Sequence, residues 1–426
     1  MQREYTINFL GEGTFGCTIC PPIKLTDEFI KKKPDFSIKN FSFDKIDNCN
    51  YIGKILAVHR SGKTNDTYES ELKNLLSIQE LDPDGIYTPQ LIYANIHKAS
   101  DLLNKIKNNT KLSECLNDKI KKENKYGYII LKHVGINLQK KYETYNNNLK
   151  KLDNSMSIIL FLRKFIKLLN FLDKIYKKHI HLDIKSDNIT EIDANEMFLI
   201  DFGRFQEINK INVIHFVTKL LKQEHYMVSF EPKIYNKLLS EKNKIKNLTI
   251  NQLIDYIDNN FEELISPYIF NNSVKQIFQK IFYSDWEKQL KQGEFIIFRD
   301  KKYNISYIYD YIRYRQKQYF INYLEIKYSE NIYDKIYNID DFLYNMFLPI
   351  INKIDFSYIG ITFARTIIYF NYDTYDKCSV HFKKHFEKMI KDLLFNKFVD
   401  VKSFINYLEY LINYESLINL INKRFS

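Results

Sequence analysis

Three glycines and two prolines near the start of the chain limit how this segment can fold. The glycines stand at 11, 13 and 16 in GEGTFG, directly after the apolar run YTINFL, and the prolines follow at 21 and 22. Glycine lets backbone N–H groups approach phosphate oxygens because no Cβ is in the way. A dinucleotide-binding fold needs a helix directly after such glycines, and the two prolines forbid that helix. The segment therefore predicts two short strands around a glycine turn, over residues 4–20.

The rest of the chain reads as a strand-rich first third followed by a helical remainder. We expect strands at 51–58, 89–96 and 126–134, two short strands just before residue 201, and helices at 66–80 and about 155–178. Polar stretches at 23–47 and 100–124 are typical of insertions, the second of them helical or mobile. From about residue 233 the pattern is helical to the end of the sequence. These elements predict an α+β arrangement with a cleft between two lobes.

Composition excludes several classes of protein. Hydrophobic residues make up 45% of the 426 residues and charged residues 27%, which argues against a disordered chain. The net charge of +11 comes from lysines dispersed among Asp and Glu rather than from a basic block, so we expect no specific nucleic-acid site. The most apolar stretch, SIILFLRKFIKLLNFL, is interrupted by Arg163, Lys164 and Lys167, which predicts an amphipathic helix and no membrane span.

The cysteines point to a reducing environment. They are odd in number and scattered, at positions 17, 20, 49, 115 and 378, and imply no disulfide framework. Cys17 and Cys20 form a CxxC, but no second pair or histidine cluster completes a zinc site. The first residues, MQREYTINFLGEG, lack the apolar region of a secretory signal. We therefore expect an intracellular, soluble protein.

Two later segments carry polar groups at spacings that suit phosphoryl transfer. They are HLDIKSDN at 181–188 and DFG at 201–203. Asp183 can accept a proton from a substrate hydroxyl, and Lys185 can reach a transferring phosphoryl group. Asn188 and Asp201 offer an amide oxygen and a carboxylate, which are ligands suited to Mg²⁺.

In this order, GEGTFG, HLDIKSDN and DFG resemble the motifs of eukaryotic-type protein kinases. The GCxxCPP turn is similar to that of the divergent serine/threonine-protein kinases of large nucleocytoplasmic DNA viruses, which would place the protein in a host cytoplasm or a virion. The resemblance is specific over 9–20, 50–78, 126–138 and 179–203 and faint elsewhere. It implies a bilobal protein-kinase-like fold, with an N-lobe at 1–134 and a C-lobe at 135–426. It also implies ATP and Mg²⁺ as cofactors and protein Ser/Thr hydroxyls as phosphoryl acceptors, since Lys185 favours Ser/Thr over Tyr specificity.

The resemblance assigns roles to individual residues. Lys54 is similar to the strand lysine that pairs with the α- and β-phosphates, with Glu71 as its favoured helix partner and Glu69 as the alternative. Asp183, Lys185, Lys54 and Glu71 are thus the expected catalytic residues, and Asn188 and Asp201 the expected metal ligands. Leu131 resembles the residue that guards the adenine pocket, followed by a hinge at 132–134. The residues assigned to the nucleotide are Leu10, Gly11, Glu12, Gly13, Thr14, Phe15, Gly16, Thr18, Ile52, Lys54, Leu131, Lys132, Val134 and Thr190.

Two fainter likenesses lie beyond DFG. Glu231 in MVSFEP resembles the glutamate that ends an activation segment, and Asp355 in IDFSYIG is similar to the aspartate that ties the catalytic loop from below. If both hold, residues near 233–350 form a helical insertion that packs on the C-lobe and could receive a regulatory protein. The protein substrates themselves cannot be named from the sequence.

Some residues depart from the family's pattern. Thr18, Ile52 and Thr190 would make the adenine pocket narrower and more polar than usual. Leu182 replaces the arginine that receives an activation-segment phosphate, so we expect activity without that phosphate.

Three other functions compete with a protein kinase. A pseudokinase scaffold would bind nucleotide without transfer, although the base, the metal aspartate and the strand lysine all have candidates here. A small-molecule kinase of the aminoglycoside or choline type shares an HxDxxxxN loop, but Lys185 and the glycine turn favour protein substrates. A nucleic-acid-binding structural protein is suggested only by the net charge.

Overall fold

The computed structural model describes residues 7–13, 16–24, 34–38, 49–58, 68–100, 109–120, 125–141, 155–192, 196–209, 231–265, 272–351, 354–369, 378–395, 397 and 400–425. The chain divides into two units, Met1–Leu138 with Asp187–Phe205, and Gln139–Ser186 with Gln206–Ser426. The first unit contains an antiparallel sheet and the second is mostly helical, so the predicted α+β class is confirmed. The DFG segment belongs to the first unit, whereas most of HLDIKSDN belongs to the second.

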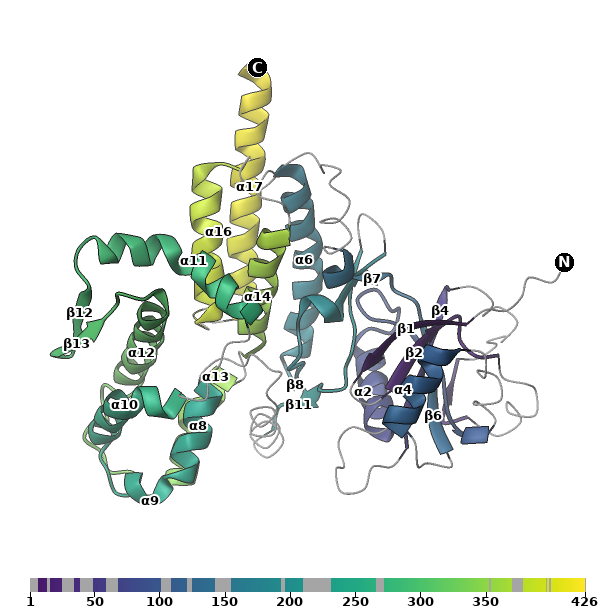
Figure 1. Ribbon diagram of the computed structural model, residues 1–426, viewed down its shortest axis with the longest axis horizontal. Coiled ribbons are helices and arrows are strands. Elements are labelled where there is room, and N and C mark those ends of the chain that lie inside the picture. The colour runs from purple at the N-terminus through teal and green to yellow at the C-terminus, as the bar shows by residue number, and fades with distance from the viewer. Residues whose placement is uncertain are drawn as a thin grey trace. The chain divides into compact units, whose positions relative to one another are not determined.

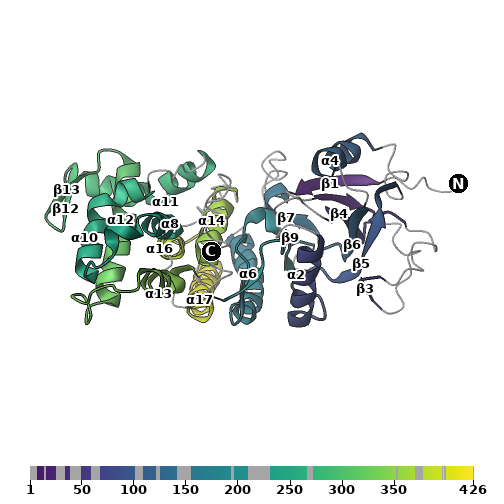
Figure 2. The ribbon, with the colours of Figure 1, turned by 90° about the horizontal axis from the view of Figure 1, so that it is seen from below.

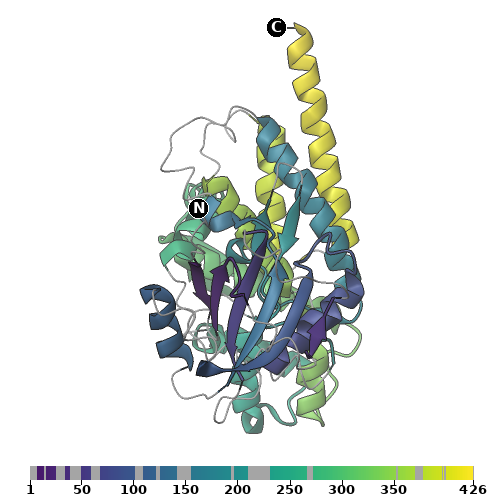
Figure 3. The same cartoon turned by 90° about the vertical axis from the view of Figure 1, so that its right-hand side faces the viewer.

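A six-stranded sheet forms most of the first unit (Figure 3). Its neighbouring strands run antiparallel in the order β1-β2-β4-β6-β5-β3. They span Asn8–Gly13 (β1), Gly16–Cys20 (β2), Phe36–Ser37 (β3), Tyr51–Ala57 (β4), Leu91–Lys98 (β5) and Lys125–Lys132 (β6). The predicted pair of strands around the glycine turn is confirmed, as are the strands predicted for β4, β5 and β6.

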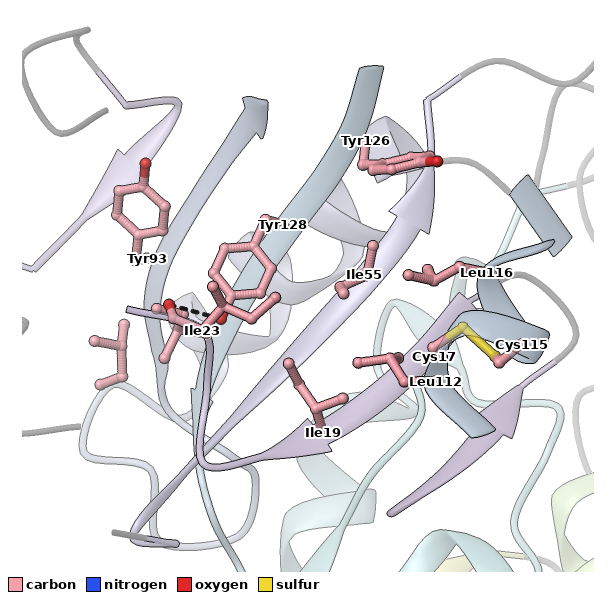
Figure 4. Close-up of a cluster of buried hydrophobic side chains, with 12 residues drawn as sticks. Cys17, Ile19, Ile23, Ile55, Tyr93, Leu112, Cys115, Leu116, Tyr126 and Tyr128 are labelled. Atoms are coloured by element: carbon pink, nitrogen blue, oxygen red, sulfur yellow. Dashed lines mark hydrogen bonds between the residues drawn. A yellow bond between two sulfur atoms is a disulfide. The ribbon is translucent and has the colours of Figure 1, made fainter. Parts of the chain in front are cut away.

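One face of this sheet packs on helix α4 (Thr110–Ile120). Ile19 of β2 and Ile55 of β4 are completely buried there, together with Leu112 and Leu116 of the helix (Figure 4). The helix accounts for part of the predicted insertion at 100–124. Because successive side chains of a strand point to opposite faces, Lys54 must point to the other face of the sheet.

Helix α2 (Tyr68–Leu81) packs on that other face, and its position depends on Tyr68. The ring of Tyr68 fills the place where a Cβ on Gly127 of β6 would stand, at 2.2 Å, so only glycine fits beneath it. The hydroxyl group of Tyr68 donates to Asp35 Oδ2 at 2.7 Å. The helix ends where LDPDG was expected to stop it, and the Asp82 carboxylate accepts backbone N–H groups from the turn that follows. The helix predicted at 66–80 is therefore confirmed.

A small sheet completes the first unit. It joins β10 (Met197–Leu199), β9 (Ile189–Glu191) and β7 (Ile136–Asn137), in that order. The backbone N–H of Leu199 donates to the carbonyl of Tyr87 at 2.8 Å, which connects this sheet to the turn after α2. The two short strands predicted before DFG are confirmed.

Two disulfides lie in the first unit, so the prediction of no disulfide framework is wrong. Cys17 of β2 is bonded to Cys115 of α4 (Figure 4), and Cys20 is bonded to Cys49. Cys17 and Cys20 thus have different partners, although they form a CxxC. Sequence spacing could not show this, because Cys115 reaches β2 only through the packing of α4 on the sheet.

The second unit is built around four helices that lie side by side (Figures 1 and 2). They are α6 (Ser155–Ile175), α14 (Ile354–Tyr369), α16 (Val380–Leu394) and α17 (Val401–Phe425). Short strands β8 (His179–Ile180) and β11 (Gln206–Glu207) pair with each other beyond α6. The amphipathic helix predicted at about 155–178 is confirmed.

The segment predicted as an insertion, 233–350, contains helices and one unexpected hairpin. Its helices are α8 (Glu231–Ser240), α9 (Lys242–Ile245), α10 (Ile250–Ile265), α11 (Asn272–Leu290), α12 (Ile308–Lys327) and α13 (Ile339–Ile351). Phe282 of α11 packs on Phe395 and Asp285 pairs with Lys391 at 2.5 Å, so this segment packs on the end of α16.

The hairpin consists of β12 (Phe295–Phe298) and β13 (Lys301–Asn304), and it corrects the expectation of continuous helix after residue 233. Its two-residue turn, Arg299 and Asp300, has positive φ at both positions, which such turns require. Lys301 pairs with Asp258 of α10, a side chain that is 2% exposed. The hairpin thus makes a long-range ion pair with α10, and its turn lacks a sequence that could be recognised.

None of the helices in the parts of the chain that the structure describes has both the length and the apolar character needed to cross a membrane.

Candidate functional site

Lys54 and Glu71 form an ion pair within the first unit. Lys54 lies in β4 on the face covered by α2, and Glu71 lies in the first turn of that helix. Their side chains are 19% and 12% exposed. Glu69, the alternative partner, is exposed on the same helix. The structure therefore pairs Lys54 with the glutamate that the sequence favoured.

Asp201 is the third charged group of this cluster. Burial alone would lower the pKa of Lys54, but the carboxylates of Glu71 and Asp201 outweigh burial, so the pKa of Lys54 lies above its ordinary value. The Lys54 ammonium thus stays charged at neutral pH. The ammonium group is thus paired with Glu71 and lies within the electrostatic influence of Asp201.

Several residues assigned to the nucleotide share the sheet face that carries Lys54. Thr18 in β2 lies directly opposite Lys54 in the register of the strands. Ile52 lies two residues before Lys54 and directly opposite Leu131 of β6. Because the side-chain period of a strand is two, all four side chains belong to one face. They are brought together although they come from three separate parts of the sequence.

The glycine turn has one open position and one closely packed position. Within the described residues, and apart from its chain neighbours, no heavy atom lies within 4 Å of the place a Cβ on Gly11 would occupy, so this position is open. A Cβ on Gly16 would lie 2.2 Å from the carbonyl oxygen of Ile55, so Gly16 is required for packing. Leu10, Glu12 and Gly13 lie in β1 with Gly11. The tip of the turn, Thr14 and Phe15, lies outside the described residues.

The predicted hinge follows β6. The backbone N–H groups of Lys132 and His133 donate to Gln90 and Asn50, at 2.9 and 2.8 Å, which fixes the path of this segment. Val134 is 3% exposed. Thr190 in β9 is equally buried, and among the described residues its hydroxyl oxygen has no hydrogen-bond partner.

The two expected metal ligands both belong to the first unit. The backbone N–H of Ile200 donates to the carbonyl of Asn188 at 2.9 Å, which brings Asn188 next to the residue before Asp201. Asp201 has φ 61°, and its Oδ1 accepts the N–H of Gly203 at 3.4 Å. An amide oxygen and an exposed carboxylate are hard ligands, so Asn188 and Asp201 would be chemically suited to hold Mg²⁺.

Helix α2 also contacts the DFG segment directly, through a residue that the sequence analysis missed. Asn74 Nδ2 donates to the carbonyl oxygen of Phe202 at 2.8 Å. Phe202 is 1% exposed and packs on Phe205. The only sequence signal is that Asn74 lies three residues after Glu71 and so shares its helix face.

HLDIKSDN, the predicted catalytic loop, lies mostly in the second unit, over residues 181–186. The Asp183 side chain is 5% exposed, and Lys185 Nζ lies 3.2 Å from its Oδ2. The backbone N–H of Asp183 donates to His181 Nδ1 at 3.3 Å. The chain therefore presents a carboxylate and an ammonium side by side.

Asp355 of α14 binds the backbone at the start of HLDIKSDN, as predicted. Its two carboxylate oxygens accept the backbone N–H groups of His181 and Leu182, both at 2.9 Å. Leu182 has φ 63°, a left-handed conformation that is costly for a residue other than glycine, so the Asp355 contacts stabilise it. Burial raises the pKa of Asp355 to about 7, although the two backbone N–H groups oppose that shift.

A second set of contacts lies at the end of the loop and was also missed by the sequence analysis. Ser186 donates its hydroxyl hydrogen to Gln139 Oε1 at 3.1 Å, and Arg365 of α14 contacts the same hydroxyl at 3.5 Å. Helix α14 thus supports both ends of the loop.

Some predicted positions cannot be placed. The activation segment at 210–230 lies outside the described residues, and Glu231 is described only as the first residue of α8. In the described part of the chain no three His, Cys, Asp or Glu side chains gather as a metal site.

Comparison with known proteins adds no family. No protein-family model matches the chain, and no curated protein matches it. Any function must therefore be argued from the residues.

Proposed function

We propose that this protein is an ATP- and Mg²⁺-dependent protein kinase that phosphorylates Ser or Thr hydroxyls of protein substrates. The observation that carries the proposal is the Lys54–Glu71 ion pair beside Asp201, on the sheet face that also presents Thr18, Ile52 and Leu131. In this proposal the first unit is the β-rich lobe and the second the helical lobe of a protein-kinase-like fold. The GCxxCPP turn further supports a place among the divergent kinases of large DNA viruses.

In this mechanism Lys54 binds the α- and β-phosphates of ATP and Glu71 keeps its ammonium oriented. Asn188 and Asp201 would hold Mg²⁺, which neutralises charge on the phosphate groups. Asp183 accepts the proton of the substrate hydroxyl while the hydroxyl oxygen forms a bond to the γ-phosphorus. The bond between the γ-phosphorus and the bridging oxygen of the β-phosphate breaks, and ADP leaves. Lys185 supplies positive charge next to Asp183. The Asp355 contacts fix the backbone that carries Asp183.

The test is transfer of radiolabelled phosphate from ATP to generic acidic and basic proteins. We expect Asp183→Ala to bind nucleotide normally and to turn over about 10²–10⁴-fold more slowly, the usual contribution of a positioned base. Asp201→Ala should abolish the Mg²⁺-dependent activity, whereas Asp84→Ala, at an exposed position after α2, should change nothing. Nucleotide binding by the wild type without any transfer would favour a scaffold instead. The regulatory partner for 233–350 and the site of action in a host cell or virion stay predictions.

A further inference from the structure

We propose that Asn74 is a positioning residue that aligns Asp201 with the Lys54–Glu71 pair. This inference rests on the proposed function, because it concerns how the same site acquires its metal. The starting observation is that one helix contacts both parts of the site. Glu71 of α2 binds Lys54, and Asn74, one turn later on the same face, donates to the Phe202 carbonyl at 2.8 Å.

The Phe202 carbonyl already has a partner inside its own turn. The backbone N–H of Phe205 donates to it at 3.1 Å, which closes the turn that follows DFG. The Asn74 amide is a second donor, and it comes from a different element. Its contribution is therefore to attach the closed turn to α2, rather than to satisfy a carbonyl that would otherwise have no partner.

The backbone of Asp201 gives such an attachment a role. Its φ of 61° lies in the left-handed region, which is less favourable than the right-handed region for a non-glycine residue, although aspartate adopts it more readily than most, and the contact of its Oδ1 with the Gly203 N–H is long, at 3.4 Å. The residue that follows it, Phe202, is anchored by its buried ring and by Asn74. The direction of the Asp201 carboxylate is thus tied to the helix that also orients Lys54.

The identity of residue 74 agrees with this role. Asparagine is a poorer helix former than leucine, and position 74 lies inside α2 between Leu72 and Leu75. An apolar residue would favour the helix but could not donate to Phe202. A side chain that only packed on the DFG turn would not need an amide.

The experiment replaces the amide with two apolar side chains of different size, Asn74→Leu and Asn74→Ala. Both residues favour the helix, so a shared effect reports the lost donor and not the helix or the volume. Ser77→Ala is the matched control, because the exposed Ser77 hydroxyl donates only to Lys73 O of its own helix, at 3.1 Å. Binding of a fluorescent ATP analogue is titrated with Mg²⁺ and also measured without metal, and thermal melting checks the fold.

We expect both Asn74 variants to need about 3- to 10-fold more Mg²⁺ for half-maximal nucleotide binding, the equilibrium effect of one lost hydrogen bond. Their metal-free affinity should stay within about twofold of the wild type, because Lys54 and Glu71 keep their pairing. Wild-type Mg²⁺ dependence in both variants would overturn the inference and leave the proposed function intact. An equal loss of metal-free and metal-dependent binding would also overturn it, since Asn74 would then only stabilise the unit. If the wild type itself shows no Mg²⁺-dependent binding, the proposed function fails and the inference fails with it.

Discussion

The Lys54–Glu71 pair offers the most direct test of the proposed nucleotide site. We consider Lys54→Met, Glu71→Gln and the double variant, which remove one charge, the other charge, and both while keeping side-chain volume. The pair is 19% and 12% exposed, so it is worth more than the 0–1 kcal/mol typical of a surface ion pair. It is not fully desolvated, so it is worth less than the roughly 3–5 kcal/mol released when a buried pair is broken. We therefore expect about 1–2 kcal/mol for the orienting effect of Glu71.

These magnitudes set the expected binding constants. Lys54→Met removes a charge-assisted contact to phosphate, worth about 1.5–3 kcal/mol, and should weaken ATP binding roughly 10- to 150-fold. Glu71→Gln should weaken ATP binding about 5- to 30-fold, because Asp201 still attracts the Lys54 ammonium but does not replace the orienting contact with Glu71. The double variant should bind like Lys54→Met alone, since Glu71 acts only through the lysine.

The assay is equilibrium titration with a fluorescent ATP analogue, which needs no turnover and no known substrate. Glu69→Gln is the control, because Glu69 is an exposed glutamate in the same helical turn. Losses that add in the double variant would refute the coupling. Equal losses in the Glu69 and Glu71 variants would show that the helix as a whole, and not this pair, is what matters.

Three further predictions concern stability and regulation. Because burial raises the pKa of Asp355 to about 7 from about 4 in the unfolded chain, its contribution to stability is fully present below pH 4 and is lost as pH rises through 7. The free energy of unfolding, followed by the fluorescence of the single Trp286, should therefore rise by about 2–3 kcal/mol more in the wild type than in Asp355→Asn between pH 8 and pH 5. A difference between the two proteins that stays constant over this range would contradict the prediction. The two disulfides close loops of 29 and 98 residues in the first unit, so reduction should cost up to about 3–5 kcal/mol each by the chain-entropy estimate. The midpoint of thermal unfolding followed by circular dichroism should therefore fall, and equal midpoints with and without reductant would refute this. Since Leu182 cannot pair with a phosphate, kinase activity after phosphatase treatment should stay within about tenfold of the activity of the untreated protein, or about 1.4 kcal/mol in activation free energy. A larger loss would reveal another phosphate receptor.

The sequence alone was sufficient for features that depend on neighbouring residues. Glycine, proline and alternating apolar residues act over a few positions, so the strands around the glycine turn, β4, β6 and the end of α2 could be predicted. The residues proposed to carry chemistry, such as Asp183 and Asp201, could be named for the same reason, since their motifs are contiguous. The resemblance of IDFSYIG to a family motif likewise assigned Asp355 to the backbone of HLDIKSDN, and the structure shows that contact.

Tertiary packing decided what depends on the contact of distant elements. The choice between Glu69 and Glu71 is set by the rotation of α2 on the sheet, and that rotation follows from Tyr68 lying over Gly127, 59 positions later in the chain. The Cys17–Cys115 bond and the Asn74 contact to Phe202 arise in the same way, across 98 and 128 positions.

The hairpin at 295–304 also could not be predicted from the local sequence. Its turn residues, Arg299 and Asp300, are not of the Asn-Gly type that predicts a two-residue turn. The hairpin contacts the buried Asp258 of α10, more than forty residues earlier, which pairs with Lys301. Local sequence preferences carry no information about such a partner, because Asp258 lies far from the hairpin in the sequence.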